Sequence, residues 1–181
     1  MGQFAPQYHA LLPLRLQFGL RTLLNTVEKF FNPADAPYQV SGFFHANYIE
    51  RIRGCMTGGK QSWMVQGEEG SIELAVGRKS PVFAAESADD IVLNPAEIGL
   101  GMERVRLETP KELAPHVALN WAVVNGEMDG DVRNQIVQSA GTIFHLLGRA
   151  SSVVDGIEQA QTLLTNGSVK QTFERIQSYT P

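Results

Sequence analysis

His45 is the histidine whose position in the sequence best suits ligand chemistry. It follows Phe43 and Phe44, at the end of a segment with the pattern of a strand. Strand ends in open α/β sheets face the crevice where ligands bind. Imidazole can donate, accept or carry a proton near neutral pH, although a purely structural hydrogen bond is the alternative role. A serine nucleophile is not indicated, because the G-x-S-x-G pattern of a nucleophile elbow does not occur.

Glutamates near the middle of the chain could supply oxygen ligands to a hard cation. Glu68, Glu69 and Glu73 lie within six residues of one another, and such cations bind several fixed oxygens. The alternative is that these carboxylates are solvated loop charges. Cys55 is the only cysteine, so the chain can form neither an internal disulfide nor a cluster of thiolate ligands. Its place on an apolar helical stripe predicts that it is buried.

Composition indicates a globular protein with its own core. The 181 residues are 43% hydrophobic and 19% charged, with a net charge of −4. This charge argues against a usual nucleic-acid binder, which needs a dense basic footprint, although a local patch is not excluded. Neither a signal peptide nor an apolar run near membrane-spanning length is present. We therefore predict a cytoplasmic location without membrane association.

The elements before residue 70 alternate between helix and strand. Spacing of apolar residues predicts helices at 23–31 and 48–56, the first ended by Pro33. Aromatic and β-branched residues predict strands at 38–44 and 62–66. A strand, helix and strand in this order predict a right-handed parallel crossover.

The rest of the chain changes from short strands to helices. Strands are expected at 72–76, 81–85 and 90–93, paired antiparallel, with Pro81 indicating an edge strand. Helices follow from 115 onward. We expect Asp131 to cap one of them, and Ser152 and Ser168 to begin capping boxes of the last two.

Several short sequence pieces, taken in order, resemble one known family. They are FAPQYH (4–9), FGLRTLLNT (18–26), Asn32-Pro33, MVQGEEG (64–70), NPAEIGL (94–100) and the glycine-containing stretches at 141–148 and 156–158. Their order and spacing are similar to the anthranilate phosphoribosyltransferase family, also called glycosyltransferase family 3. In that family the first pieces lie near the middle of a chain about twice as long.

The resemblance implies a transferase of tryptophan-biosynthesis type. Such proteins move phosphoribosyl from phosphoribosyl pyrophosphate to anthranilate or a related aromatic acceptor, with Mg²⁺ as cofactor, and form homo-oligomers, in known cases dimers. Carried onto this sequence, Arg21 matches the arginine that holds the acceptor carboxylate. His9 matches a residue lining the acceptor tunnel, and Asn25 and Pro33 match neighbouring positions.

The sequence also departs from the family pattern. Ser71-Ile72-Glu73 stands where the family has L-D-E, so Glu73 is the remaining metal candidate and Ile72 cannot ligate. The stretch from Thr26 to Phe31, which includes Glu28 and Lys29, stands where the family has L-G-P-L-x. The glycine cradle for pyrophosphate does not occur, and Thr57-Gly58-Gly59-Lys60 is interpreted as a helix stop. These departures resemble a divergent branch, some of whose members are dimeric nucleic-acid binders.

We therefore predict an α/β fold, with a parallel sheet extended by antiparallel strands and helices at both ends of the chain. It would be the carboxy-terminal portion of a nucleoside phosphorylase/phosphoribosyltransferase catalytic domain. Residues 1–181 form a single partial domain, with an acceptor-side helical segment at 1–33, a sheet region at 38–107 and terminal helices at 108–181. The leading hypothesis is a phosphoribosyltransferase whose complete form is active while this piece alone is not. The alternatives are a non-catalytic nucleic-acid-binding paralogue and a truncated product that retains the fold.

Overall fold

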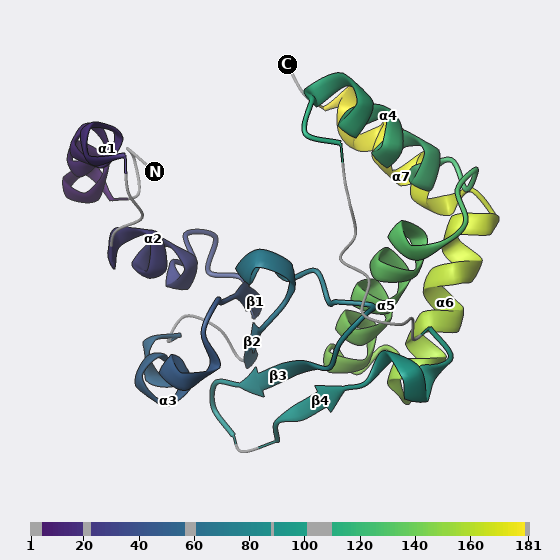
Figure 1. The fold of residues 1–181 in the computed structure, drawn as a ribbon, viewed down its shortest axis with the longest axis horizontal. Coiled ribbons are helices and arrows are strands. Elements are labelled where there is room, and N and C mark those ends of the chain that lie inside the picture. Colours follow the sequence, from purple (N-terminus) through teal and green to yellow (C-terminus); the bar gives the residue numbers. More distant parts are fainter. Residues whose placement is uncertain (1–4, 20–22, 57–60, 88, 101–109, 180–181) are drawn as a thin grey trace. The chain divides into compact units, whose positions relative to one another are not determined.

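The computed structural model describes residues 5–19, 23–56, 61–87, 89–100 and 110–179. It has the α/β fold expected from the sequence (Figure 1). Contacts divide the chain into two compact units. The first contains residues 1–72 and 82–91, and the second contains 73–81 and 92–181.

The chain begins with helices and continues into a sheet. Helix α1 spans Pro6–Phe18 and α2 spans Leu23–Val27, followed by a 3₁₀ turn at Glu28–Phe30. The sheet elements are β1 (Tyr38–Gly42), β2 (Gln61–Val65), β3 (Ser80–Ala84) and β4 (Ile91–Leu93), with the short α3 (Ile49–Ile52) between β1 and β2.

The sheet combines a parallel pair with an antiparallel extension. Strand β1 runs parallel to β2, with Tyr38 opposite Gln61, and β2 runs antiparallel to β3, with Val65 opposite Val82. The strand order is β1-β2-β3-β4. The prediction that Pro81 marks an edge strand is therefore wrong. Proline is tolerated there because the pairing of β3 with β2 begins at the next residue, so no ladder bond from Pro81 to β2 is needed.

The crossover between β1 and β2 contains a shorter α-helix than the helix predicted at 48–56 from its apolar stripe. Only Ile49–Ile52 is α-helical, and 3₁₀ turns at 46–48 and 53–55 flank it. Met56 is buried with Phe43 and Met64, but Cys55 is exposed, against expectation. The tighter 3₁₀ turn advances about 120° per residue, which carries Cys55 off the face that an α-helix would bury.

The segment 72–76 is not a strand, although its apolar residues are buried from Leu74 to Val76. The Leu74 amide donates to Ser139 Oγ at 3.0 Å, and the Ala75 amide donates to Ser80 Oγ at 3.2 Å. The Ala75 carbonyl accepts from the Gln138 side chain at 3.0 Å. Side chains thus replace a neighbouring strand as hydrogen-bond partners of this buried backbone. A period-two sequence pattern cannot distinguish a strand paired with another strand from an extended segment whose backbone is bonded by side chains.

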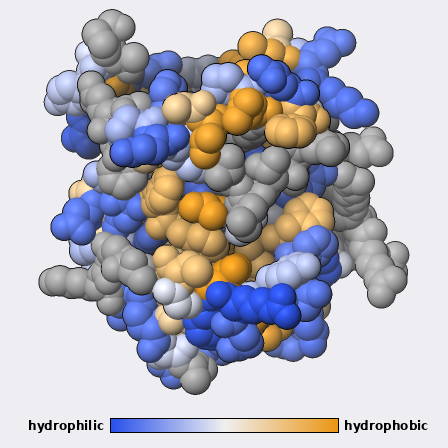
Figure 2. Space-filling view, turned by 90° about the vertical axis from the view of Figure 1, so that its left-hand side faces the viewer, coloured by the Kyte–Doolittle hydropathy of each residue, from blue (hydrophilic) through white to orange (hydrophobic). Residues whose placement is uncertain are grey.

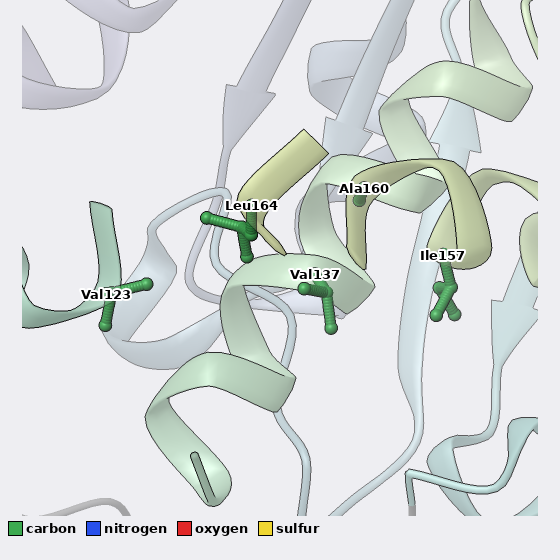
Figure 3. Close-up of a cluster of buried hydrophobic side chains, with 5 residues drawn as sticks. All are labelled: Val123, Val137, Ile157, Ala160 and Leu164. Atoms are coloured by element: carbon green, nitrogen blue, oxygen red, sulfur yellow. The ribbon is translucent and has the colours of Figure 1, made fainter. Parts of the chain in front are cut away.

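Helices make up most of the second unit. They are α4 (Leu113–Val124), α5 (Asp131–Leu146), α6 (Val153–Thr165) and α7 (Ser168–Ser178). Figure 3 shows their shared core, in which Val123 of α4 and Val137 of α5 lie with residues of α6. The α6 members are Ile157, Ala160 and Leu164.

Helices α5 and α6 cross backbone to backbone at two glycines. A Cβ placed on Gly141 would lie 2.5 Å from the Ile157 amide nitrogen. A Cβ on Gly156 would lie 2.2 Å from the Gly141 carbonyl oxygen. Real Cβ atoms do not approach backbone so closely, so both positions require glycine.

The helix starts confirm one of the three expected caps. Ser152 is the N-cap of α6, and its hydroxyl accepts from the Asp155 amide at 3.1 Å. Asp131 and Ser168 are instead the first residues inside α5 and α7, behind Gly130 and Gly167 at φ 95° and 78°. A positive φ favours glycine, so the glycines occupy the N-cap positions. Asp131 and Ser168 therefore lie one position further into the helix than predicted.

Candidate functional site

The side chain of Tyr8 fastens α1 to the turn that follows α2. Its hydroxyl donates to Glu28 Oε2 at 2.9 Å, and its ring meets Phe31 edge-on with centroids 5.5 Å apart. The next residue, His9, is exposed, and its amide donates to the Ala5 carbonyl within the first turn. The Tyr8 contacts therefore determine how the helix carrying His9 is held on the first unit.

The segment after α2 is in turn fastened to β1. Ser41 Oγ donates to the Lys29 carbonyl at 2.6 Å, and Gln39 Nε2 donates to the Phe31 carbonyl at 3.3 Å. Asn32 closes the turn by exchanging side-chain hydrogen bonds with the Ala36 backbone. This turn presents Pro33 at the surface.

The residues matched to an acceptor site lie on one stretch of the first unit. His9 on α1 and Pro33 are exposed, and Asn25 on α2 is half-buried. Arg21 lies outside the described residues, as does the 57–60 segment interpreted as a helix stop. Several apolar side chains of α1 are also exposed: Leu11, Leu14, Leu16 and Phe18. Figure 2 shows exposed hydrophobic residues among hydrophilic ones on the side where Figure 1 draws α1.

A lysine for which the sequence predicted no functional role lies at the carboxyl end of β1. Lys29 Nζ donates to the Gly42 carbonyl at 2.9 Å and to the Gly70 carbonyl at 2.8 Å. A Cβ on Gly42 would lie 2.4 Å from the Gly70 oxygen, so strand end and loop are in direct contact. The only sequence signal was the charged replacement at 28–30.

Aromatic side chains and an arginine form a series after β1. The rings of Phe44 and His45 have centroids 4.9 Å apart, and those of His45 and Tyr48 are 6.0 Å apart. The Arg51 guanidinium carbon lies 5.9 Å from the Tyr48 centroid. All four side chains are exposed. We call Phe44, His45, Tyr48 and Arg51 the aromatic series; it includes the histidine favoured by the sequence.

Two further histidines, His116 of α4 and His145 of α5, have contacts with backbone carbonyls. His116 Nδ1 lies 3.2 Å from the Pro110 carbonyl, and His145 Nδ1 lies 3.2 Å from the Ala150 carbonyl. Each ring thus contacts a backbone carbonyl just outside its own helix, which is a structural role.

Arg53 is bound in an ion pair and does not contribute to a free basic patch. Its guanidinium donates to both carboxylate oxygens of Asp90, at 3.0 and 2.9 Å, and to the carbonyls of Ala84 and Ser87. The hydrogen bond from Arg53 lowers the pKa of Asp90, and Asp90 raises the pKa of Arg53. The pair joins the end of α3 to the β3–β4 connection.

The described carboxylates of the middle segment do not gather into a group of three possible metal ligands. Glu73 and Glu69 are exposed, and Ile72 occupies the central position of the triplet. Within the described ranges, no group of three histidine, cysteine or acidic residues could hold a metal ion. The described residues thus supply no complete set of metal ligands, and Glu73 as a ligand of the Mg²⁺ implied by the resemblance stays a prediction.

Among the described helices, none has both the length and the apolar character needed to cross a bilayer.

Comparison with known proteins decides the family. A model described as the glycosyl transferase family, a/b domain, matches residues 2–170. The chain belongs to this family. A relative in it, the anthranilate phosphoribosyltransferase of Herpetosiphon aurantiacus, is 26% identical over 182 residues, which cover 96% of this chain and 54% of that protein.

Solved structures of family members support the same assignment. Anthranilate phosphoribosyltransferase from Thermus thermophilus superposes with a TM-score of 0.76 and 28% identity, over 94% of this chain and 51% of that one. The Saccharomyces cerevisiae enzyme, solved in complex with PRPP and Mg, gives 0.74 at 16% identity, over 91% and 48%. At that identity the likeness shows the fold alone. The chain spans about half the length of these relatives.

Proposed function

We propose that this chain is the acceptor-side part of a phosphoribosyltransferase. In its complete form the protein would transfer phosphoribosyl from phosphoribosyl pyrophosphate to anthranilate or a related aromatic acceptor. The observation that carries the proposal is the family match over residues 2–170, together with structural likeness to the Thermus enzyme at 28% identity. The transfer itself requires the part of the relatives that this chain does not span.

Within this proposal, the N-terminal stretch binds the acceptor. Arg21 would hold the acceptor carboxylate through its guanidinium, because a planar fork of donors matches the two oxygens. His9 is exposed on α1, and Asn25 and Pro33 lie further along the same stretch. The Tyr8 contacts with Glu28 and Phe31 would keep α1 in place while the ligand binds.

We propose a role for Mg²⁺ in the complete protein only, and not in acceptor binding by this chain. The yeast enzyme was solved with PRPP and Mg, whereas the residues described here include no group of three histidine, cysteine or acidic side chains that could hold a metal ion. No step of the proposed acceptor binding passes through a metal. We further propose that the complete protein works in the cytoplasm as a homo-oligomer.

Replacement of Arg21 should remove the preference for a carboxylate-bearing acceptor. By calorimetry, the wild-type chain should bind anthranilate about ten- to a hundredfold more tightly than 2-aminobenzamide, because a charge-assisted hydrogen bond is lost with the amide. Arg21→Ala should bind the two compounds equally. Arg175→Ala, an exposed arginine of α7, is the matched control. Equal binding of both compounds by the wild-type chain would refute the role of Arg21.

A second candidate function, binding of single-stranded nucleic acid, is favoured by the aromatic series. Exposed rings with a neighbouring guanidinium are suited to stacking on bases. Its rings and Arg51 follow the carboxyl end of β1 along the chain and contact one another in order. The carboxyl ends of strands are where open α/β sheets bind ligands. The net charge of −4 limits the electrostatic share of such binding.

Loss of a ring from the aromatic series tests this second function. If the protein binds single-stranded nucleic acid, Tyr48→Ala should weaken binding of a labelled oligonucleotide by about five- to a hundredfold, since each stacked base contributes about 1–3 kcal/mol. Fluorescence anisotropy at two salt concentrations would measure this. Tyr179→Ala, which removes an exposed tyrosine after α7, should leave binding unchanged. Equal loss in both variants, or no binding by wild type, rules the function out.

A further inference from the structure

Two departures from the family pattern fall close to one contact in the structure. Ile72 stands where the pattern L-D-E has a carboxylate, and Lys29 lies in the stretch where the pattern L-G-P-L has no charge. Lys29 Nζ donates at 2.8 Å to the carbonyl of Gly70, two residues before Ile72. A carboxylate is thus missing from the loop that an added ammonium contacts.

The backbone of Lys29 is held firmly enough for its side chain to act as a brace. Its carbonyl accepts from Ser41 Oγ at 2.6 Å and from Gln39 Nε2 at 3.3 Å. The hydroxyl donor belongs to a buried side chain of β1, since Ser41 is 8% exposed. The ammonium then joins the Gly42 carbonyl at the strand end to the Gly70 carbonyl in the loop.

The loop needs such a brace because its backbone is strained. Glu69 adopts φ 50° and Gly70 adopts φ 78°, and a non-glycine residue in the left-handed region costs about 1 kcal/mol or more. Within the loop, the Gly67 amide donates to the Ser71 carbonyl at 3.2 Å, and the Ser71 amide donates to the Glu68 carbonyl at 2.8 Å. These neutral bonds are made across a turn that faces solvent at Glu69.

We propose that Lys29 is the cation that holds the 67–72 loop against the carboxyl end of β1, and that the loop keeps this conformation without a divalent metal. Lys29 is a positioning residue in this scheme, and the fixed charge comes from the chain itself. The inference rests on the family assignment and deepens the proposed function, because it concerns the loop that in the family pattern carries the metal-binding carboxylates.

Hydrogen exchange at the Gly67 and Ser71 amides tests the proposal on the unliganded 181-residue chain. In wild type, exchange should be the same with Mg²⁺ and with EDTA. Lys29→Met should speed exchange at both amides about ten- to a hundredfold, as expected for loss of hydrogen bonds from a charged donor. Lys29→Arg should retain most of the protection, while the neutral donor in Lys29→Gln should not. Lys170→Met, on exposed α7, is the matched control and should match wild type.

Each contrary result overturns the proposal. Faster exchange in wild type on removal of Mg²⁺ would mean that a metal holds the loop. Unchanged exchange in Lys29→Met would mean that the lysine does not. Full protection in Lys29→Gln would show that the charge is not needed. Failure of the proposed function would be seen differently, as an absence of acceptor binding in calorimetry. That result would not change the hydrogen exchange measured in the loop.

Discussion

Replacement of Gly156 by alanine should lower the free energy of unfolding of the helical unit by about 3 kcal/mol, the upper part of the usual range for overpacking. The added Cβ would lie 2.2 Å from the Gly141 carbonyl oxygen, a backbone atom that cannot rotate away. Helices α5 and α6 must then separate, which loosens the packing of Val137 against Ile157. Urea unfolding followed by circular dichroism would measure the loss.

The sign of this effect is informative, because alanine usually stabilises a helix relative to glycine by about 1 kcal/mol. Glu158→Ala, at an exposed position of the same helix, is the control and should change stability by no more than about half a kcal/mol. Gly141→Ala should also destabilise, since its Cβ would lie 2.5 Å from the Ile157 nitrogen. A more stable Gly156→Ala protein would contradict the close crossing.

Loss of the Arg53 guanidinium should produce the second large effect. Arg53→Met should lower stability by about 2 kcal/mol, because the carboxylate of Asp90 and the carbonyls of Ala84 and Ser87 lose a charged donor. Methionine keeps much of the apolar stem, but it also loses the guanidinium, whose central carbon lies 5.7 Å from the Phe83 ring centroid. Thermal unfolding would measure the change, with Arg51→Met on the neighbouring exposed surface as control.

A double-mutant cycle separates the ion pair from the carbonyl contacts. If the pair dominates, Asp90→Asn and Arg53→Met together should cost less than the sum of the two single changes. Additive losses would show that Arg53 acts through the carbonyls of Ala84 and Ser87 instead.

Acid should weaken the same contact. The hydrogen bond from Arg53 lowers the pKa of Asp90 in the folded state below its ordinary value of about 4. The contribution to stability is therefore complete above that ordinary value and is lost as pH falls through the lower folded pKa. In Arg53→Met, unfolding curves between about pH 5 and pH 2 should depend less on pH. An unchanged acid dependence would indicate that other carboxylates dominate it.

The sequence predicts the fold class because its strongest signals are local and agree with one another. The parallel pair follows from two buried strands separated by an apolar stripe, and β1 and β2 lie within one residue or two of the predicted bounds. The cap at Ser152 follows from a serine placed three residues before an acidic residue, a spacing typical of helix starts, although the similar spacing at Ser168 did not give the cap of α7.

The wrong predictions share a physical cause: tertiary partners that a local pattern does not contain. Leu74 to Val76 are apolar enough for a strand, but their backbone partners are Gln138 and Ser139, more than 60 residues away, and Ser80. Cys55 is exposed because it lies in a 3₁₀ turn that follows the short α3, where the sequence predicted one continuous α-helix.

The candidate site was predicted only in part for a related reason. His9, Asn25 and Pro33 were found through resemblance, and the structure describes their positions without testing their roles. Lys29 went unnoticed because lysine on a helical stripe normally indicates a solvated face. Its importance appears only when the carbonyls of Gly42 and Gly70 are seen within 2.9 Å of its ammonium.

The glycine crossing of α5 and α6 also bears on the order of events during folding. Its contacts join residues 131–146 to 153–165 across a six-residue connection, so little chain entropy is lost in closing the loop. Contacts of low sequence separation form fast, whereas the β1–β2 pairing must close a connection that includes α3. We therefore expect the α5–α6 hairpin to be the earliest part of the chain to acquire its native arrangement, with the sheet completed around β2 afterwards.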